Sequence, residues 1–333
     1  MGTRGYGRYR GREGRVGKVI WVIALCIVLL AAVAFLLGQQ YLIYDDEGNV
    51  RWAVPFGQSG DGGYDNPIDP ADVTIERQEP EAPPRRALAQ VHARELENGA
   101  LWWQPENVLS SLEEDMVIEC KTVGGSLRYA TSVTLPAGVA SEQGSTRDNL
   151  TALLRSDHYA VARIHCFCDT AYARSVPGTA LTAADGQLWY DGEGRAWLDP
   201  AGAETLAYLT ALCQELAELG FDELLLDSFS YPSTGDVSSI DLAADTDQTA
   251  ILADFAAAIR KTIPETVVLS VAIHADTEGI AKTLYDSFDR LYVDETADIA
   301  ALTTLLGDTC DAATELAVQS RTKPQSGSYV LLP

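Results

Sequence analysis

The chain has 333 residues, 47% of them hydrophobic, and its 24 Lys and Arg against 48 Asp and Glu give a formal net charge of −24. This length and apolar content are sufficient for one large hydrophobic core. The acidity argues against binding to nucleic acid or to anionic wall polymers, since the chain would repel a phosphate backbone.

The N-terminus has the charge pattern of a membrane anchor. Six basic residues and one acid occupy residues 1–18, and Val19–Leu37 is uncharged and apolar. Such a run is long enough to cross a bilayer as a helix, and basic residues favour the cytoplasmic side. We expect a cytoplasmic tail (1–18), a transmembrane helix (19–38) and a single-pass cell-membrane protein with its remaining chain extracellular. The alternative is a signal peptide cleaved after Ala34, which the continuing apolar run disfavours.

Residues 39–84 are expected to form an extracellular hairpin and linker. Two short extended runs surround Glu47-Gly48-Asn49, which predicts the hairpin. Residues 57–84 are rich in Gly, Pro, Asp and Glu without periodicity, which predicts the linker. After residue 18 the chain has 18 Lys and Arg against 47 Asp and Glu, a net charge of −29. That surface favours a neutral or cationic partner, or else only keeps the domain soluble.

From residue 85 to residue 333, strand-like runs alternate with helical stretches. The eight runs are residues 87–93, 116–122, 160–168, 223–229, 267–274, 290–295, 315–320 and 328–333. Eight such units predict an α/β protein with a closed (β/α)8 TIM-type barrel rather than an open sheet. Only Arg321–Gly327 separates the last two runs, so the barrel should be abbreviated at its C-terminal end.

The stretch 189–232 is the most informative part of the domain. Asp199 as N-cap and Pro200 in the first turn predict the start of a helix, and Gly220 predicts its end. The apolar run that follows predicts a strand buried on both faces, with Asp227 at its C-terminal end. Barrel enzymes place their catalytic residues at this end of the strands.

These motifs resemble a family of glycoside-hydrolase-like bacterial barrels, membrane-anchored or secreted, grouped as a domain of unknown function. The family pattern is Trp, a charged turn with Gly, Trp-x-Asp-Pro, a helix, then Gly-Phe-Asp-Glu, apolar residues, Asp, an aromatic residue and Pro. This chain matches it in order at Trp189, Gly194, Trp197, Asp199, Pro200, Gly220, Phe221, Asp222, Glu223, Asp227 and Pro232. A weaker resemblance reaches upstream through residues 162–169 and 117–125. It covers the chain from about Arg85 to the C-terminus.

The chain also departs from the family pattern. Ser228 and Ser230 stand where the family has Tyr and Arg after the strand-end Asp, and Ala272 stands where it has an inward Asp. The Ser-Pro-Met-x-Tyr of the family's sixth strand is replaced by residues 291–298. These departures favour the alternative of a catalytically inactive barrel that binds glycan or serves as an envelope scaffold.

The alternation of side chains along strands predicts which residues face the lumen. The apolar set of the third run packs on the helices, which turns Arg163 and His165 inward. The same rule turns Asp227 inward, and Glu119 together with Lys121. In the sixth run the inward pair is either Tyr292 with Asp294 or Val293 with Glu295.

Glycoside hydrolysis needs two carboxyl groups, one protonated and one ionised. The strand-end position and the family resemblance make Asp227 the best candidate for the acid. The second carboxylate is open between Asp294, Glu295 and Glu119. The alternative for Asp227 is a structural ion pair with Arg163 or Lys121.

Aromatic residues of the rim loops are candidates for sugar binding, alongside the inward Arg163 and His165. Flat rings stack on sugars, but rings in such loops also pin the loop in place. The candidates are Trp189, Tyr190, Trp197 and Tyr231, with Trp102 and Trp103 as an extension or as packing beneath.

The expected function is a membrane-anchored extracellular glycoside hydrolase acting on a cell-wall or matrix polysaccharide. No cofactor and no metal are expected. A deacetylase metal site from His165, His274, Asp169 and Asp276 is the alternative, disfavoured because the chain has no HxxxH-type spacing. The six cysteines show no paired CxxC pattern, and buried free thiols are expected rather than disulfides.

Overall fold

The computed structural model describes residues 42–44, 50–52, 85–275 and 278–333. In the N-terminal part, β1 (Leu42–Tyr44) and β2 (Val50–Trp52) pair antiparallel at the position where the sequence predicts a hairpin. The predicted tail (1–18) and transmembrane helix (19–38) lie outside the described residues and stay predictions. Within the part of the chain that is described, no helix has both the length and the apolarity to cross a bilayer.

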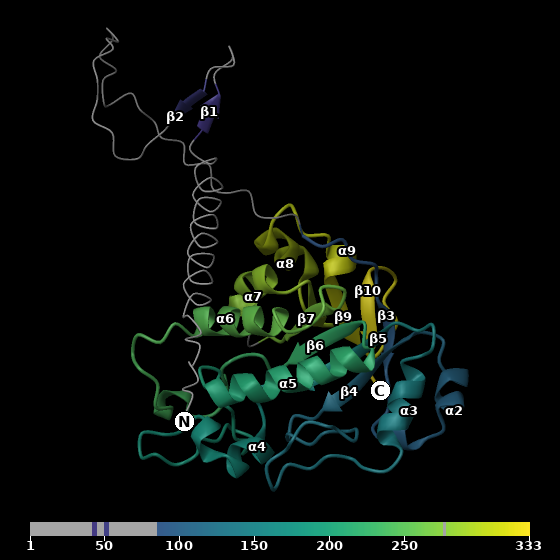
Figure 1. Ribbon diagram of the computed structural model, residues 1–333, viewed down its shortest axis with the longest axis horizontal. Coiled ribbons are helices and arrows are strands. Elements are labelled where there is room, and N and C mark those ends of the chain that lie inside the picture. The colour runs from purple at the N-terminus through teal and green to yellow at the C-terminus, as the bar shows by residue number, and fades with distance from the viewer. Residues whose placement is uncertain (1–41, 45–49, 53–84, 276–277) are drawn as a thin grey trace, which may run out of the picture. The chain divides into compact units, whose positions relative to one another are not determined.

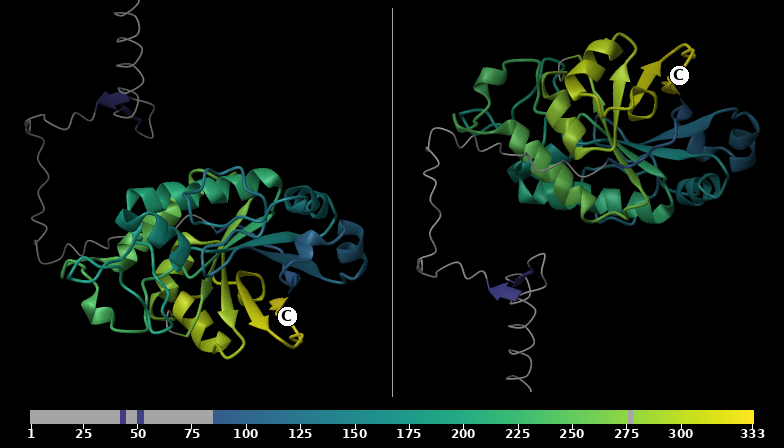
Figure 2. Two further views of the ribbon diagram at one scale, coloured as in Figure 1. Left: turned by 90° about the horizontal axis from the view of Figure 1, so that it is seen from below. Right: turned by 90° about the horizontal axis from the view of Figure 1, so that it is seen from above.

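Residues Ala82–Pro333 form one compact unit built on a closed barrel of eight parallel strands. The strands neighbour one another in chain order, and β10 closes the barrel against β3. Both views of Figure 2 show helices packed along the outside of the strands. The strands are β3 (His92–Glu95), β4 (Asp115–Lys121), β5 (Ala160–His165), β6 (Glu223–Asp227), β7 (Val268–Ile273), β8 (Arg290–Asp294), β9 (Leu316–Ser320) and β10 (Ser328–Leu331).

Helices follow the strands and cover the outside of the barrel (Figure 1). Consecutive helices pack on one another from α5 to α8, so they form a continuous outer layer on that side. The helices are α2 (Pro105–Ser110), α3 (Thr146–Leu153), α4 (Thr170–Ser175), α5 (Ala203–Leu219), α6 (Gln248–Arg260), α7 (Ala281–Ser287), α8 (Ile299–Leu306) and α9 (Ala312–Glu315). The short helices η1 (Ala100–Trp102), η2 (Pro177–Thr179), η3 (Val237–Ser239) and η4 (Glu278–Ile280) lie in the connections.

The strands divide the apolar core into two layers, as the period of two requires. One layer fills the barrel with mostly small or β-branched side chains and one tyrosine: Val91, Ala93, Val117, Val161, Leu225, Ala272, Tyr292, Ala317 and Val330. The alternate residues of the same strands pack against the helices in the larger cluster. The (β/α)8 prediction is therefore confirmed, and no helix lies between β9 and β10.

Among the element boundaries that differ from the prediction are the starts of the first strand and of helix α5. The first strand begins at His92 rather than at residue 87, because its partners on β10 and β4 pair only with His92–Glu95. Helix α5 begins at Ala203 rather than at Pro200. Asp199 instead closes a turn in which its carbonyl accepts the N–H of Gly202. The end at Gly220 is as predicted, with a left-handed φ of 109° that suits glycine.

Candidate active site

The C-terminal ends of the strands bring several charged side chains into the top layer of the lumen. Val161 and Leu225 lie inside the barrel, so Arg163 and Asp227, two residues further along each strand, also face inward. Arg163 Nη1 lies 3.3 Å from Asp227 Oδ2, and its Nη2 also hydrogen-bonds Gln319 of β9. The predicted inward positions of both residues are thus confirmed. The ion pair that the sequence offered as the structural alternative for Asp227 is also present.

Asp227 is buried and held by four groups. Besides Arg163, its Oδ1 accepts a hydrogen bond of 3.1 Å from His274 Nε2 and one of 2.6 Å from the backbone N–H of Ser228. His165 Nδ1 lies 3.6 Å from the same oxygen. Burial by itself raises the pKa of Asp227, but His165, His274 and Arg163 outweigh it and hold this pKa well below its usual range. The lowered pKa favours the ionised form of Asp227, which fits a nucleophile or base better than the acid that the sequence predicts.

The turn after Asp227 is strained. Ser228 is the one non-glycine residue with a positive φ, 49°, among the residues described. Its hydroxyl lies 3.0 Å from His165 Nδ1, so the turn connects the strand ends of β5 and β6. Strain of this kind persists where surrounding contacts enforce it, often at functional sites.

Glu119 contacts His165 and so belongs to the same layer of charged side chains. Glu119 Oε1 lies 3.5 Å from His165 Nε2, and Oε2 accepts a hydrogen bond of 3.4 Å from Arg128. Burial raises the pKa of Glu119. The hydrogen bonds and charges of His165 and Arg128 lower it by more than that, so the net pKa lies below the usual value. Glu119 is thus ionised in this arrangement.

Asp294 and Asp227 both contact His274, whose ring lies between them. Tyr292 lies in the barrel interior and Val293 packs outward, which decides the open choice in favour of Tyr292 with Asp294. His274 Nδ1 lies 3.1 Å from Asp294 Oδ1, on the opposite side of the ring from Asp227. The imidazole bridges two carboxylates, and the hydrogen bond that it donates to Asp227 raises the pKa of His274 to about 9. Glu295 instead accepts a hydrogen bond from Ser320.

This bridge predicts a pH-dependent contribution of His274 to stability. Because the pKa of His274 is higher in the folded state, its protonation stabilises the fold. This contribution is fully present below pH 6.5, the ordinary histidine pKa, and is lost as pH rises through about 9. The thermal midpoint of the wild type should therefore exceed that of His274→Gln by more at about pH 6 than at about pH 10. Melting curves of both proteins check this. A difference that does not change with pH would contradict it.

Glu95 belongs to the site although the sequence reasoning missed it. It lies two residues after the inward Ala93, and its Oε2 is 3.3 Å from Arg163 Nη2. Burial raises the pKa of Glu95; Arg163 offsets part of that rise, while Glu119 and Asp227 add to it. The predicted strand ended at residue 93, so the alternation rule was not applied to Glu95. A strand extended to residue 95 would have found it.

A cavity of about 440 Å³ opens beside Asp227. Arg163, His165 and His274 line its inner side, and Arg195 and Trp197 line it from the loop after β5. A cavity of this size at the C-terminal rim of a barrel is a typical place for a small ligand or one part of a polymer.

The loop 189–197 is organised by Asp191. The Asp191 carboxylate accepts hydrogen bonds from Trp197 Nε1 (2.9 Å), from Arg195 Nε (2.8 Å) and from the backbone N–H groups of Glu193 and Arg195. Burial raises the pKa of Asp191, and these hydrogen bonds lower it to a net value below the usual one. The carboxylate thus fixes Trp197 and Arg195 at the cavity wall.

The four aromatic candidates differ in what they can offer a sugar. Trp189 is only 3% exposed, and its Nε1 donates to the carbonyl of Asp236 and to Ser239. It therefore pins the loop rather than presenting a face for stacking. Tyr231 and Trp197 are both buried, and Trp197 lines the cavity. Tyr190 is exposed, with Arg174 over its ring.

Lys121 does not face the lumen, contrary to the prediction. A β-bulge between Glu119 and Lys121 shifts the register, so that Lys121 pairs with the outward Ile164. The bulge shifts the alternation by one residue. Lys121 Nζ forms a buried ion pair of 2.9 Å with Asp169, at the N-terminus of α4.

The cysteines and the alternative metal site can be placed in part. Cys120, Cys166, Cys168 and Cys213 are buried free thiols, and Cys310 is a partly exposed one. Asp276 of the alternative metal site lies outside the described residues, and Asp169 is taken up by Lys121. Over the described ranges, no group of three or more His, Cys, Asp or Glu side chains is arranged to hold a metal ion.

One comparison with a solved structure supports the barrel fold. The glycoside hydrolase domain of PgaB (BpsB) from Bordetella bronchiseptica superposes with a TM-score of 0.51 at 10% identity, covering 74% of this chain and 94% of that one. A hypothetical protein from Ruminiclostridium thermocellum ATCC 27405 gives 0.45 at 22% identity, covering 54% and 96%. The α-galactosidase AgaA from Geobacillus stearothermophilus gives 0.48 at 10%, covering 74% of this chain but only 39% of that enzyme.

No curated protein matches the chain. Residues 106–285, just over half of the chain, match the family described as "Putative glycosyl hydrolase domain". The matched range contains the strand end that delivers Asp227 and the loop organised by Asp191. The chain belongs to this glycosyl hydrolase domain family.

Proposed function

We propose that the chain hydrolyses glycosidic bonds, with Asp227 as the ionised carboxylate and Glu95 as the proton donor. One observation supports this most directly. Asp227, which is buried, and Glu95, which is partly buried, contact the two terminal nitrogens of the same guanidinium, that of Arg163, at 3.3 Å each. They are therefore at most about 9 Å apart, which does not exceed the longest carboxyl separation of glycosidases, about 9.5 Å.

The two carboxyl groups have opposite tendencies. Asp227 has a lowered pKa because His165, His274 and Arg163 together outweigh its burial, and Glu95 has a raised pKa chiefly because of burial. Glycosidases need this division, since the protonated group assists the leaving sugar while the ionised one attacks the sugar or activates water. Glu119 and Asp294 are further candidates for the role of the ionised group. Each is connected to Asp227 through one histidine.

The substrate and its location are inferred from the sequence. The basic tail and the apolar run 19–38 support a single-pass anchor with the barrel outside the cell. The acidic remainder of the chain favours a neutral or cationic polysaccharide of the wall or matrix. The chemistry uses carboxyl groups alone and requires no cofactor.

A glycan-binding or envelope-scaffold role without catalysis is the second candidate. It is favoured by Ala272, which lines the cavity beside Asp227 where the family resemblance implies an Asp. A barrel that lacks this carboxylate would retain the cavity for binding but would have lost one charged group at its floor.

Glu95→Gln tests the assignment of the proton donor. The variant should lower kcat on natural glycosides by about 100- to 10,000-fold, because the departing sugar oxygen is no longer protonated. The loss should be much smaller on dinitrophenyl glycosides, whose leaving group departs without a proton. Steady-state rates on both substrate types check this.

Glu119→Gln and Asp294→Asn serve as the controls for Glu95→Gln. If either of them, and not Glu95→Gln, shows this dependence on the leaving group, Glu95 is not the donor. If the wild type hydrolyses no member of a panel of wall and matrix polysaccharides that it binds, the scaffold role is correct instead.

A further inference from the structure

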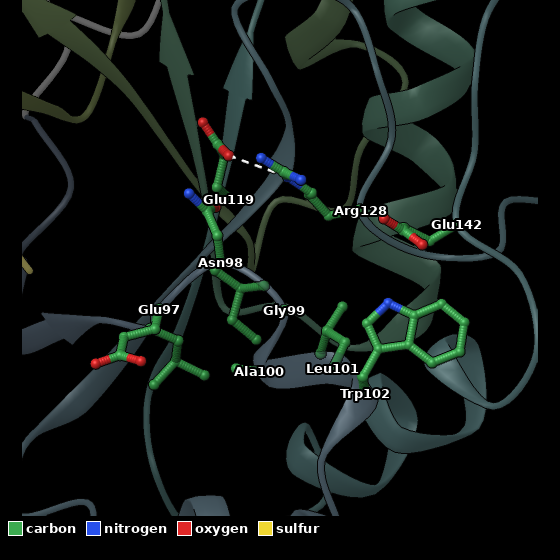
Figure 3. A pocket seen from close by; sticks show the side chains of 11 residues that line it. Glu97, Asn98, Gly99, Ala100, Leu101, Trp102, Glu119, Arg128 and Glu142 are labelled. Carbon is green, nitrogen blue, oxygen red and sulfur yellow. Dashed lines mark hydrogen bonds and ion pairs between the residues drawn. The ribbon is translucent and has the colours of Figure 1, made fainter.

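A second cavity, of about 210 Å³, lies on the same rim between the loops that follow β3 and β4. Figure 3 shows Trp102 along one wall, Asn98 opposite it, and the pair Glu119–Arg128 at one end. Glu119 lines this cavity, and its carboxylate lies 3.5 Å from His165, which lines the Asp227 cavity. The two cavities are thus neighbours separated by one pair of side chains.

Trp102 is presented to solvent in a fixed position. Its side chain is 51% exposed, which is unusual for the largest apolar residue type. Asn149 Nδ2 donates to the carbonyls of Leu101 (2.8 Å) and Trp103 (3.1 Å), on either side of Trp102. The ring also lies against Gly144, where an added Cβ would approach it to 3.2 Å. Little conformational entropy remains to be lost when a ligand stacks on this ring.

The charges of the second cavity select against acidic sugars. Glu97, Glu119 and Glu142 line it together with one cation, Arg128, which is already engaged by Glu119. A carboxylate-bearing sugar would meet net negative charge, whereas a neutral or cationic one would not. Drug-sized ligands occupy cavities of about 300 to 1,000 Å³. The second cavity is smaller, at about 210 Å³, which suits a single sugar ring.

We infer that this second cavity is a subsite for one neutral or cationic sugar unit of the polysaccharide, held by stacking on Trp102. The inference rests on the proposed action on polysaccharides. It adds that the chain recognises a segment extending past the Asp227 cavity toward the loop after β3. Short substrates that occupy only the Asp227 cavity should not depend on Trp102.

Trp102→Ala tests the inference, with the neighbouring Trp103→Ala as its matched control. Trp103 is equally exposed, at 49%, but does not line the cavity. Calorimetric titrations would use the full chain in detergent and four hexasaccharides, made of glucose (β-1,4), N-acetylglucosamine, glucosamine or galacturonic acid. At least one of the first three should bind. Trp102→Ala should weaken that binding about tenfold or more, and Trp103→Ala less than about twofold.

A third variant distinguishes the loss of ring stacking from a folding defect. Trp102→Tyr keeps an aromatic face and should retain most of the binding, which a purely structural role of the Trp102 ring would not predict. The inference is overturned if no hexasaccharide binds, if Trp102→Ala binds as the wild type does, if both alanine variants lose binding equally, or if only the galacturonic acid hexamer binds.

Binding and hydrolysis fail separately in this design. Trp102-dependent binding by a wild type that cleaves nothing would refute the proposed hydrolase and leave the subsite in place. Cleavage of long and short substrates with unchanged kcat and KM in Trp102→Ala would refute the subsite and leave the hydrolase in place.

Discussion

Asp227→Asn should lower kcat for glycan hydrolysis by at least about 1,000-fold while glycan binding is retained. The amide has nearly the same shape and its oxygen can still accept the N–H of Ser228, which donates to Asp227 at 2.6 Å. It has no negative charge with which to attack a sugar or to activate water. Release of reducing ends measures the hydrolysis, and calorimetry with the same polysaccharide measures the binding.

Glu193→Gln is the matched control for Asp227→Asn. Glu193 lines the same cavity, but its side chain is 71% exposed and pairs with Arg195 at the surface. We expect a change in kcat below about threefold, because exposed ion pairs contribute little. An equal loss in both variants would place the effect in the loop and not in the Asp227 carboxylate.

Asp227→Glu separates catalysis from folding. Asp227→Asn leaves Arg163 and His274 without their shared anion, so its thermal midpoint must be measured alongside kcat. Asp227→Glu keeps the charge and moves it by about 1 Å, which typically costs about 100-fold in rate. A folded Asp227→Glu with wild-type kcat would contradict a role for Asp227 in the reaction.

Arg290→Met should destabilise the barrel by about 3 to 5 kcal/mol. Arg290 and Glu223 form an ion pair inside the barrel at the opposite end from Asp227, and both are fully buried. Arg290 also donates to the carbonyls of Ala89 (2.7 Å) and Thr314 (2.8 Å). Its loss leaves the Glu223 carboxylate buried without a counter-charge. Urea denaturation of wild type and variant measures the difference in unfolding free energy.

Two further variants show whether the uncompensated charge is the cause. Arg94→Met removes one partner of the Arg94–Glu114 pair, whose arginine is half exposed, and should cost less than about 1 kcal/mol. Adding Glu223→Leu to Arg290→Met should recover much of the loss, because no unpaired charge then stays buried. Equal losses in Arg290→Met and Arg94→Met would show that burial of the pair does not matter.

The strands were predictable because their signal is local. Each of the eight runs is apolar in alternation or throughout, and each contains an observed strand or overlaps one. The inward positions of Arg163 and Asp227 followed from a period of two, which depends only on neighbouring residues. The same rule left Tyr292 and Val293 undecided, because both are apolar enough to pack on either face of β8.

The errors occurred where a distant partner decides the local structure. The bulge that turns Lys121 outward depends on the register between β4 and β5. The start of the first strand depends on β10, which lies more than 200 residues further along the chain. Glu95 was missed because the end of that strand is set by the pairing of Glu95 with Val117 of β4 and not by its own sequence.

The sequence by itself determined the number of strands, the barrel class and the strand end that bears Asp227, because apolar periodicity and turn residues act over a few residues. Only the tertiary structure decided which groups share a guanidinium and which carboxyl groups have raised or lowered pKa values. Those properties depend on burial and on charges from β3, β4, β5, β6 and β7 that meet when the barrel closes. The electrostatic environment of a carboxyl group is a property of the closed barrel and not of any one strand.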